Sequence, residues 1–395
     1  MPLGPRARLA VYKGGSRVSS DVLAAMDQAV ADGVDILSIS LGVLEINLYE
    51  SPLSIASFGA REKGIMICTS AGNRGQGSRT IRSGIPWAVI IASGTVDLAD
   101  YALSSATPTR ASISNKPFSG KSQEPRQLSQ VTRRDARGLN YEGILKPDLM
   151  APGVLILAAF HPQLMAASIG RNIDLATDYN LLAGPHISGV VAVLKAAHPE
   201  WSPAMIQSAM MTTSNPLDNT NQPIRAHDGS VATPFGIGLG HVDLGLVYGA
   251  SLQDLVNLVC SMNFTRNQTQ TIIRSSNNCS NPSSDLNYPS FVALIRAAEI
   301  GRTLTRRFRR SVTNVGDAAT YRVMVEAPVN TTVVVRPQTL VFKKKYETTS
   351  YSLTIQYNAD IRIQHREGAV IWIDQAGKYR VRSPIMVAAA ADNFE

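Results

Sequence analysis

The first hundred residues alternate between segments with helical spacing and short apolar runs. Apolar side chains recur every three or four residues from Asp21 to Gly33 and again from Leu53 to Lys63, and a glycine closes each segment. Apolar runs typical of buried strands occupy residues 34–41, 65–69 and 86–92. Strands that alternate with helices of about ten residues predict an α/β fold with a doubly wound parallel sheet.

The pattern is lost in the middle of the chain. Residues 104–143 are rich in Ser, Thr, Gln and Arg without an apolar face, so we expect an irregular linker there. Order resumes at 144–153 and continues through 154–160. A helix at 187–197 has Lys195 as its one strongly polar side chain and is expected to lie buried in the centre of the fold, and Ser202-Pro203 begins another helix.

Beyond Asp285 the chain changes to short alternating strands separated by turns. They are expected at 306–313, 319–327, 331–336, 350–357, 368–374 and 381–388. Six or seven strands at this spacing predict a β-sandwich. We therefore expect a first domain at 1–250, a connecting segment at 251–284 and a second domain at 285–395 that can fold independently.

Composition excludes several classes of protein. The chain is 44% hydrophobic and 17% charged, as in ordinary globular proteins, and no apolar run is long enough to span a bilayer. The net charge of +8 is scattered except at 133–134, 306–310 and 343–345, without the interleaved aromatics of a nucleic-acid surface. We predict no nucleic-acid binding, no cofactor and no metal site. The first residues lack the apolar core of a signal peptide, so no route to secretion is predicted from them.

Cysteines and glycosylation sequons point to a secreted ancestor. Cys260 and Cys279 lie close enough in sequence to form a disulfide, which leaves Cys68 free in an apolar strand. N-glycosylation sequons begin at four asparagines, namely Asn263, Asn267, Asn278 and Asn330. Three of the four fall in one short polar stretch, which suits a secreted ancestor. A secreted ancestor conflicts with the missing signal peptide.

Several stretches, in order, resemble plant subtilisin-like serine proteases (subtilases) over nearly the whole chain. In the first domain they are residues 7–13, 20–42, 70–73, 146–149, 151–153 and 185–213. Asp285–Ser290 (Asp-Leu-Asn-Tyr-Pro-Ser) and Thr313–Gly316 resemble the fibronectin type III-like domain of the same family. The resemblance implies a serine endopeptidase that acts on extracellular proteins or peptides and resides in the apoplast.

The segment Asn180–Gly189 departs from the family pattern at the point that matters most. Family members have Asn, two aliphatic residues and Ser-Gly-Thr-Ser-Met-Ala before a small residue and Pro-His. Here Leu182 is followed by Ala183-Gly184-Pro185-His186, so the segment with the nucleophile is missing. The family's catalytic Asp and His precede the part that this chain matches, its protease-associated domain belongs where 104–143 stands, and a shorter piece is missing near 241–245. The resemblance is thus to a truncated and internally deleted member.

Serine protease catalysis needs a hydroxyl nucleophile, an imidazole base, a carboxylate that orients the base and donors to the oxyanion. Of these four groups, only the oxyanion donor has a counterpart in this chain. Asn73 matches the family's oxyanion-hole position, although without the resemblance it would be read as a turn residue beside Gly72. The resemblance gives His186 a structural role. Ser188 could be proposed as a substitute nucleophile, but no base is indicated near it.

Three further polar residues are expected to be structural. His198 ends the helix and caps it or packs against it, Asp148 is a turn carboxylate, and Asp35 lies in a strand near the substrate-binding region. We therefore expect a protease by family that is catalytically inactive, or an incomplete gene model. The alternative is a non-catalytic binding protein (pseudoprotease) that acts through the remaining sheet and the sandwich. Protein or peptide substrates are expected by family.

Overall fold

The computed structural model describes most of the chain outside the region around residues 96–137. The described residues are 6–12, 19–41, 47–73, 81, 84–95, 138–140, 143–153, 156–161, 167–169, 173–175, 178–182, 186–218, 220–226, 228–239, 246–275, 277–360 and 365–390. Most of the expected linker and the stretches 183–185 and 240–245 lie outside them.

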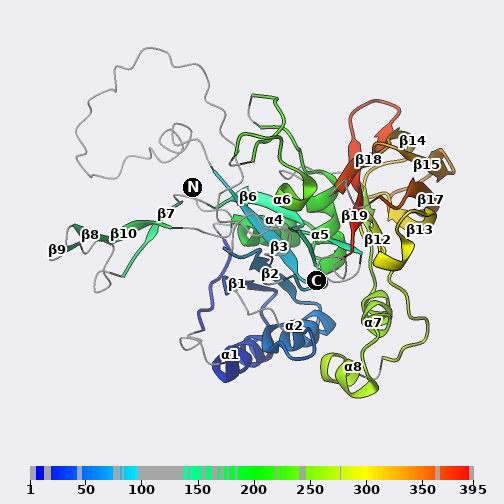
Figure 1. The fold of residues 1–395 in the computed structure, drawn as a ribbon. Coiled ribbons are helices and arrows are strands. Elements are labelled where there is room, and N and C mark those ends of the chain that lie inside the picture. The colour runs from blue at the N-terminus through cyan, green and yellow to red at the C-terminus, as the bar shows by residue number, and fades with distance from the viewer. Residues whose placement is uncertain are drawn as a thin grey trace, which may run out of the picture.

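A four-stranded sheet forms the centre of the first part of the molecule (Figure 1). Its order is β1 (Ile36–Ile39), β2 (Met66–Ser70), β3 (Val89–Gly94) and β6 (Leu149–Pro152). Every neighbouring pair is parallel, which confirms the α/β prediction. Among the described strands, β1 and β6 form the two lateral edges. All carboxyl ends therefore meet at one end of the sheet, and all amino ends at the other.

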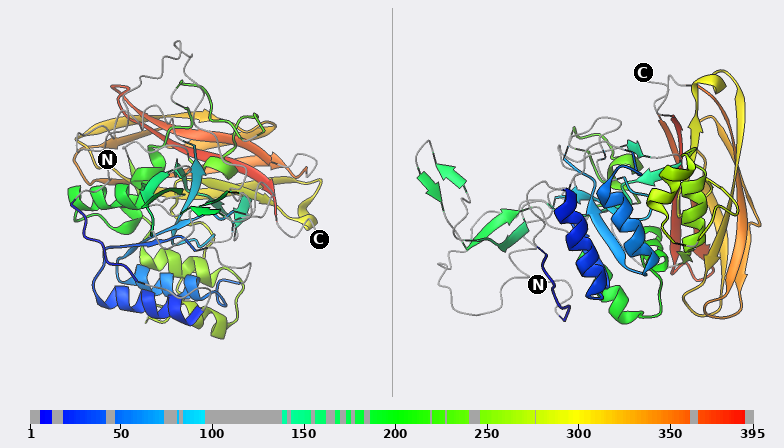
Figure 2. Two further views of the ribbon diagram at one scale, coloured as in Figure 1. Left: turned by 90° about the vertical axis from the view of Figure 1, so that its left-hand side faces the viewer. Right: turned by 90° about the horizontal axis from the view of Figure 1, so that it is seen from below.

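Helices cover both faces of this sheet (Figures 1 and 2). One side carries α1 (Ser19–Ala31) and α2 (Pro52–Glu62), and the other carries α4 (His186–Ala197) and α5 (Pro203–Thr212). The start of α2 is fixed by Ser51, whose side chain accepts from the Ser54 backbone N–H.

The expectation that α4 is a buried central helix is wrong. Its buried residues are Ile187, Val191 and Leu194, whereas Val193 is 48% exposed. Among the described elements α4 packs chiefly on β1, β6 and α5, so one face remains open.

The segments between β3 and α4 form short antiparallel pairs. β4 (Gly138–Asn140) pairs with β5 (Ile144–Lys146), so the end of the expected linker is a strand rather than irregular chain. Leu139 lies opposite Leu145 in the register of this pair, which was not recognised in the sequence. Two further pairs extend away from the body (Figures 1 and 2): β7 (Ile156–Ala159) with β10 (Tyr179–Leu182), and β8 (Ala167–Ile169) with β9 (Ile173–Leu175).

Short helices connect the two parts of the chain. They are α6 (Pro234–Ile237), α7 (Leu252–Cys260) and α8 (Arg266–Ile272). Both α7 and α8 begin with a capping box, in which Ser251 and Thr265 each exchange hydrogen bonds with the residue three positions later. A disulfide joins Cys260 to Cys279, the local pairing that the spacing allows.

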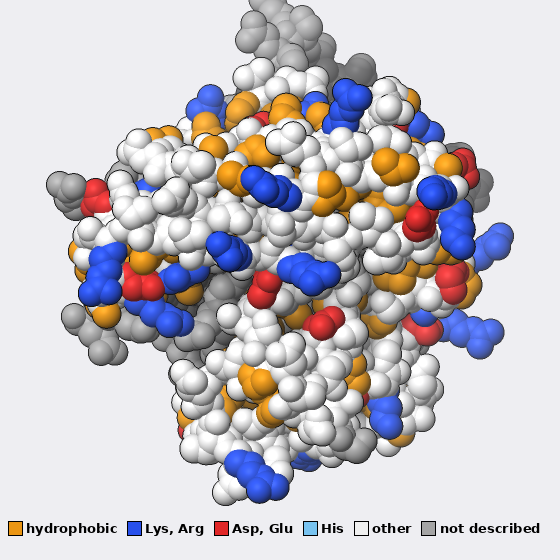
Figure 3. Space-filling model, turned by 90° about the vertical axis from the view of Figure 1, so that its right-hand side faces the viewer, with side chains coloured by type: hydrophobic (Ala, Val, Ile, Leu, Met, Phe, Trp, Pro, Cys, Tyr) orange, Lys and Arg blue, Asp and Glu red, His pale blue; other side chains and the backbone are white. Residues whose placement is uncertain are grey.

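The C-terminal part is a sandwich of two sheets, as predicted. One sheet has the order β11 (Val247–Tyr248), β13 (Thr303–Thr313), β17 (Thr348–Asn358) and β15 (Thr331–Arg336). The other has the order β12 (Phe291–Ile295), β19 (Arg380–Ala389), β18 (His365–Asp374), β14 (Ala319–Glu326) and β16 (Thr339–Phe342), and a 3₁₀ turn η1 (Ala297–Glu299) follows β12. On the outer face, Lys and Arg side chains lie singly or in small groups among hydrophobic and uncharged ones (Figure 3).

The sandwich shares a core with the body of the parallel sheet. Leu286, Tyr288, Val292 and Met386 belong to the same buried apolar cluster as the residues of β2 and β3. Strand β11 also lies upstream of residue 285 and pairs with β13. A segment that begins at 285 therefore lacks one strand of its own sheet and exposes apolar side chains that the body covers.

Candidate functional site

Asn73 lies at the carboxyl end of the parallel strands, where open α/β sheets bind ligands. It follows β2 by three residues and is exposed. The backbone N–H of Ala71 donates to the carbonyl of Ile91, which ties the end of β2 to β3. Gly72 has a φ of 108°, a conformation that other residues rarely adopt, and it turns the chain out of the sheet. This turn places Asn73 just beyond the carboxyl end of β2.

The end of β6 closes the same edge. A Cβ on Gly153 would lie 2.4 Å from the Ser93 hydroxyl, so only glycine fits there, and the Gly153 N–H donates to the carbonyl of Gly94. His186, the first residue of α4, places its Nδ1 2.8 Å from the carbonyl oxygen of Pro152. The imidazole thus ties the start of α4 to the end of β6, which is a structural contact.

Ser188, in the first turn of α4, has a hydroxyl neighbour instead of a base. Its Oγ donates to Oγ of Ser38 on β1 at 2.9 Å. The buried Cys68 thiol lies beside it, and burial raises the pKa of that thiol to about 12, which the contact with Ser188 offsets only in part. A thiol with this pKa stays protonated at neutral pH and is a poor nucleophile. Among the described residues, no imidazole bonds to Ser188 or Cys68.

A buried ion pair lies at the opposite end of the sheet, where the strands begin. We call this end the amino edge, and the end where the strands finish the carboxyl edge. Lys146 Nζ lies 2.8 Å from Oδ2 of Asp148, and both side chains are fully buried. Lys146 also donates to the carbonyl of Ala88 at 2.9 Å, and the N–H of Ile90 donates to Asp148 at 2.6 Å. Burial lowers the pKa of Lys146 and raises that of Asp148, while their mutual attraction opposes both shifts. The expectation that Asp148 is a turn carboxylate is wrong.

Two residues from distant parts of the chain complete this network. Gln207 of α5 donates its Nε2 to the hydroxyl of Tyr288 at 3.0 Å, and Lys146 donates to the same hydroxyl at 3.1 Å. Tyr288 comes from the stretch that resembles the fibronectin-like domain. The sequence singled out neither Lys146 nor Gln207. A lysine and an aspartate flanking one residue at the start of a strand were the available signal.

Two other predicted residues have different surroundings. Asp35 is exposed and precedes β1, so it lies at the amino edge and not near the strand ends where a substrate would bind. The expectation that it lies near the substrate-binding region is wrong. His198 follows α4 and stacks on Trp201 with ring centroids 4.0 Å apart, while its Nδ1 lies 3.6 Å from Glu200. It packs at the end of the helix, as expected.

The four sequon asparagines are all exposed, and Asn263 and Asn330 have positive φ angles of 55°. Asn278 directly precedes the disulfide-bonded Cys279. In the described part of the chain, no helix has both the length and the apolar character needed to cross a membrane. The same residues contain no group of three or more His, Cys, Asp or Glu side chains placed to hold a metal ion.

Comparisons with known proteins agree with this architecture. Residues 4–238 match the Subtilase family, and residues 285–387 match the fibronectin type-III domain. The chain is 40% identical to subtilisin-like protease SBT3 of Solanum lycopersicum, with 98% of this chain and 67% of that protein covered. It is 31% identical to subtilisin-like protease SBT1.6 of Arabidopsis thaliana, with 98% and 69% covered. The solved structure of the prenylagaramide maturation protease PagA superposes with a TM-score of 0.36 at 18% identity over 57% of this chain and 65% of PagA, too low to carry an argument.

The match to SBT3 also shows that, relative to that protein, positions are missing from the interior of this chain. It extends over 514 positions, whereas the whole chain has 395 residues, so at least 119 positions (514 minus 395) of the matched region have no counterpart here. Both the family match and the relatives point to the same conclusion. The chain belongs to the subtilase family of plant subtilisin-like proteases and carries the fibronectin type III-like domain at its C-terminal end.

Proposed function

We propose that this chain is a catalytically inactive subtilase, descended from serine endopeptidases that cleave extracellular proteins or peptides. One observation carries the proposal. Leu182 is followed directly by Ala183-Gly184-Pro185-His186, so the family's nucleophile segment is missing from the interior of the chain. This loss does not depend on where the sequence begins.

The geometry around the start of α4 supports the proposal. A serine becomes a nucleophile when an adjacent base removes its proton. Ser188 donates its proton to another hydroxyl, that of Ser38, and the nearest ring of the same helix, His186, is held on the Pro152 carbonyl. Asn73 alone supplies an oxyanion donor. In subtilisin, loss of the nucleophile or the base lowers turnover about 10⁶-fold.

A peptide hydrolysis assay tests the proposal. The purified chain and an intact relative are incubated with the same unfolded protein substrate, and new amino termini are counted. We expect no hydrolysis above the buffer rate from this chain. Hydrolysis that a serine-directed inhibitor blocks, and that Ser188→Ala abolishes, would contradict the proposal.

A second role, as a binding protein, is favoured by the exposed lateral edge of the sheet. Among the described strands β1 pairs only with β2, so no described strand covers its other edge, and Leu41 beyond its end is 46% exposed. An extended peptide can add to such an edge as a further strand. Transcript sequence across the Leu182–Ala183 junction separates a true pseudoprotease from an incomplete gene model. A stable transcript that reads as printed favours a pseudoprotease, whereas retained coding sequence for the nucleophile favours an incomplete gene model.

The exposed sequons and the Cys260–Cys279 disulfide fit an extracellular location, which we propose for the protein. Expression through a secretory pathway followed by glycosidase treatment tests this location. We expect a loss of mass on deglycosylation, and an unchanged mass would argue against it.

A further inference from the structure

Strand β13 of the sandwich has a lateral edge that other elements cover only in part. It pairs with β17 over its whole length, whereas β11 covers its other side only at the last two residues. The N–H of Arg309 donates to Asp285 at 2.8 Å instead of to β17. The N–H of Ser311 likewise donates to Asn287 at 3.0 Å. These two bonds show which residues of β13 direct their backbone groups away from β17.

Thr305 and Arg307 direct their backbone groups to the same side as Arg309. Alternate residues of an antiparallel strand point their N–H and C=O groups the same way, so those of Thr305 and Arg307 also face away from β17. Both residues are exposed, and within the described part of the chain no group bonds to them on that side. A row of unpaired backbone groups is a template on which an extended chain forms a further strand.

A cleft borders this edge of β13. It has a volume of about 340 Å³, within the range of roughly 300–1,000 Å³ that is typical of ligand clefts, and both Asp285 and Arg307 line it. Asp285 ties the cleft to the edge, because its carboxylate bonds to the N–H of Arg309. Arg307 is the next residue on the same side of the strand, about 7 Å further along. The cleft therefore includes the place where the bonded part of the edge ends and the unpaired part begins.

The lining of the cleft has an excess of positive charge. Four arginines and two carboxylates belong to it. Both carboxylates are already paired with arginines of the lining, Glu299 with Arg306 at 2.5 Å and Asp285 with Arg310. Among the residues that the structure describes, no carboxylate pairs with Arg307. An acidic ligand therefore complements the charge of this cleft.

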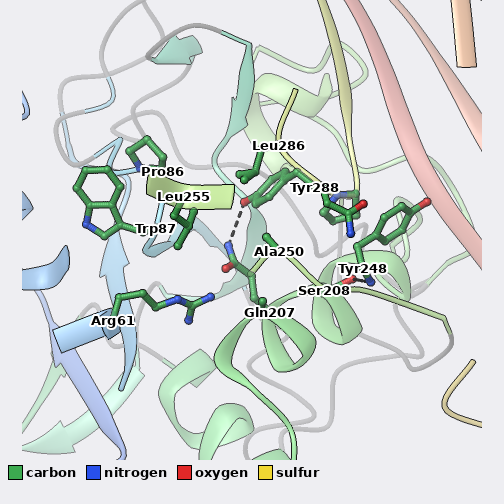
Figure 4. Close-up of a pocket in the computed structure, with 13 residues that line it drawn as sticks. Arg61, Pro86, Trp87, Gln207, Ser208, Tyr248, Ala250, Leu255, Leu286 and Tyr288 are labelled. Atoms are coloured by element: carbon green, nitrogen blue, oxygen red, sulfur yellow. Dashed lines mark hydrogen bonds between the residues drawn. The ribbon is translucent and has the colours of Figure 1, made fainter. Parts of the chain in front are cut away.

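The segment that lines the cleft beside β13 is held in place by buried contacts. The buried Arg310 donates to the carbonyl of Tyr288 at 2.8 Å and to that of Ser290 at 3.0 Å. The hydroxyl of Tyr288 in turn accepts from Gln207 of α5 (Figure 4), which anchors this segment on the body of the parallel sheet. A site that is formed before binding loses little conformational freedom when a ligand enters.

We propose that this cleft binds an extended acidic segment of a partner protein, which adds to β13 as a further strand. The backbone of the segment pairs with the unpaired groups of Thr305 and Arg307, and an acidic side chain meets the Arg307 guanidinium. Leu294 and Phe308, which are half-buried and line the cleft, offer an apolar contact beside it. Backbone pairing favours a peptide over other polyanions. The site depends neither on catalysis nor on the exposed edge of β1.

A fluorescent synthetic peptide tests the site on the purified full chain. The probe is a capped peptide of alternating Glu and Val, and its anisotropy is compared with that of the same peptide with Lys in place of Glu. We expect saturable binding of the Glu peptide only. Arg307→Glu should weaken it about tenfold, because a like-charge contact replaces an ion pair. Arg309→Glu, the same change at an exposed residue outside the lining, should weaken it less than about twofold at physiological salt.

Amide hydrogen exchange at single residues shows whether the peptide adds as a strand. On binding, exchange should slow at Thr305 and Arg307. Arg309 and Ser311 provide the internal control, since their N–H groups already bond to side chains and should change little. The proposal would be overturned by a lack of saturable binding, by unchanged exchange at Thr305 and Arg307, or by full binding to Arg307→Glu. Equal binding of the Lys peptide or of a sulfated oligosaccharide would overturn it as well.

Discussion

At the amino edge of the parallel sheet, the Lys146–Asp148 pair is fully buried and bonded to its surroundings on every side. At the carboxyl edge, Asn73 is exposed and Ser188 bonds to the hydroxyl of Ser38. The first edge is held together by residues from three distant segments, which meet at Tyr288. The second lies at the carboxyl ends of the strands, where open α/β sheets bind ligands. Under the proposed function, loss of the nucleophile segment has left this scaffold in place and removed the chemistry.

The largest effect is expected from breaking the amino edge. Asp148→Ala leaves Lys146 charged and buried without a partner, which should lower the free energy of unfolding by about 3–5 kcal/mol. Urea unfolding of the full chain measures the loss. The double variant Lys146→Met/Asp148→Leu removes both charges and should cost clearly less. An equal loss in both variants would show that packing, and not charge, holds this edge.

A smaller effect is expected from Cys68, which lies between the two edges. Its folded pKa of about 12 lies above the ordinary value of 9.0, so its contribution to stability is complete below pH 9 and is lost as the pH rises toward 12. Between pH 8 and pH 10 the wild-type chain should lose about 1.4 kcal/mol more than Cys68→Ala. Parallel urea titrations at the two pH values measure this difference. Identical pH dependence would mean that the thiol is accessible in the folded chain.

At the carboxyl edge, His186→Ala should remove about 1 kcal/mol, the typical contribution of one hydrogen bond. The affected bond is the one between Nδ1 and the carbonyl oxygen of Pro152. Thermal unfolding of the full chain measures the change, and His198→Ala, at the far end of α4, provides the comparison for a histidine outside this edge. A loss as large as that of Asp148→Ala would contradict the contrast between the edges.

The smallest effect is expected from Asn73→Ala. The side chain is exposed, so the free energy of unfolding should change by less than about 0.5 kcal/mol. Chemical denaturation measures it directly. A clear loss of stability would show that Asn73 serves the fold rather than a vestigial oxyanion site.

Features that depend on local sequence could be predicted, whereas the contacts at the amino edge, which join distant residues, could not. The parallel sheet and the sandwich were predicted because apolar periodicity and turn residues are local signals. The position of Asn73 followed from its place after β2. The amino-edge network was missed because its contacts join residues far apart, such as Lys146 and Tyr288 at a separation of 142 positions. The one local signal, a lysine and an aspartate flanking Pro147 at the start of a strand, does not show that Asp148 is buried.

The open face of α4 was also missed, for a related reason. An apolar helix with small residues is typical of a buried central position, and its sequence does not reveal which neighbours are present to cover it. The exposure of Val193 depends on the other elements of the fold. Burial is thus predictable from a segment's own composition only when its neighbours are also known.

Labelling with a fluorophosphonate probe, which reacts with activated serines, tests the central claim most directly. The folded full chain is incubated with the probe beside an intact subtilisin-like protease, and labelled peptides are identified by mass spectrometry. The account predicts labelling of the intact protease and none of this chain, because its hydroxyl at the start of α4 bonds to Ser38 and not to a base. Stoichiometric labelling of Ser188, or of any other serine in the chain, would contradict it.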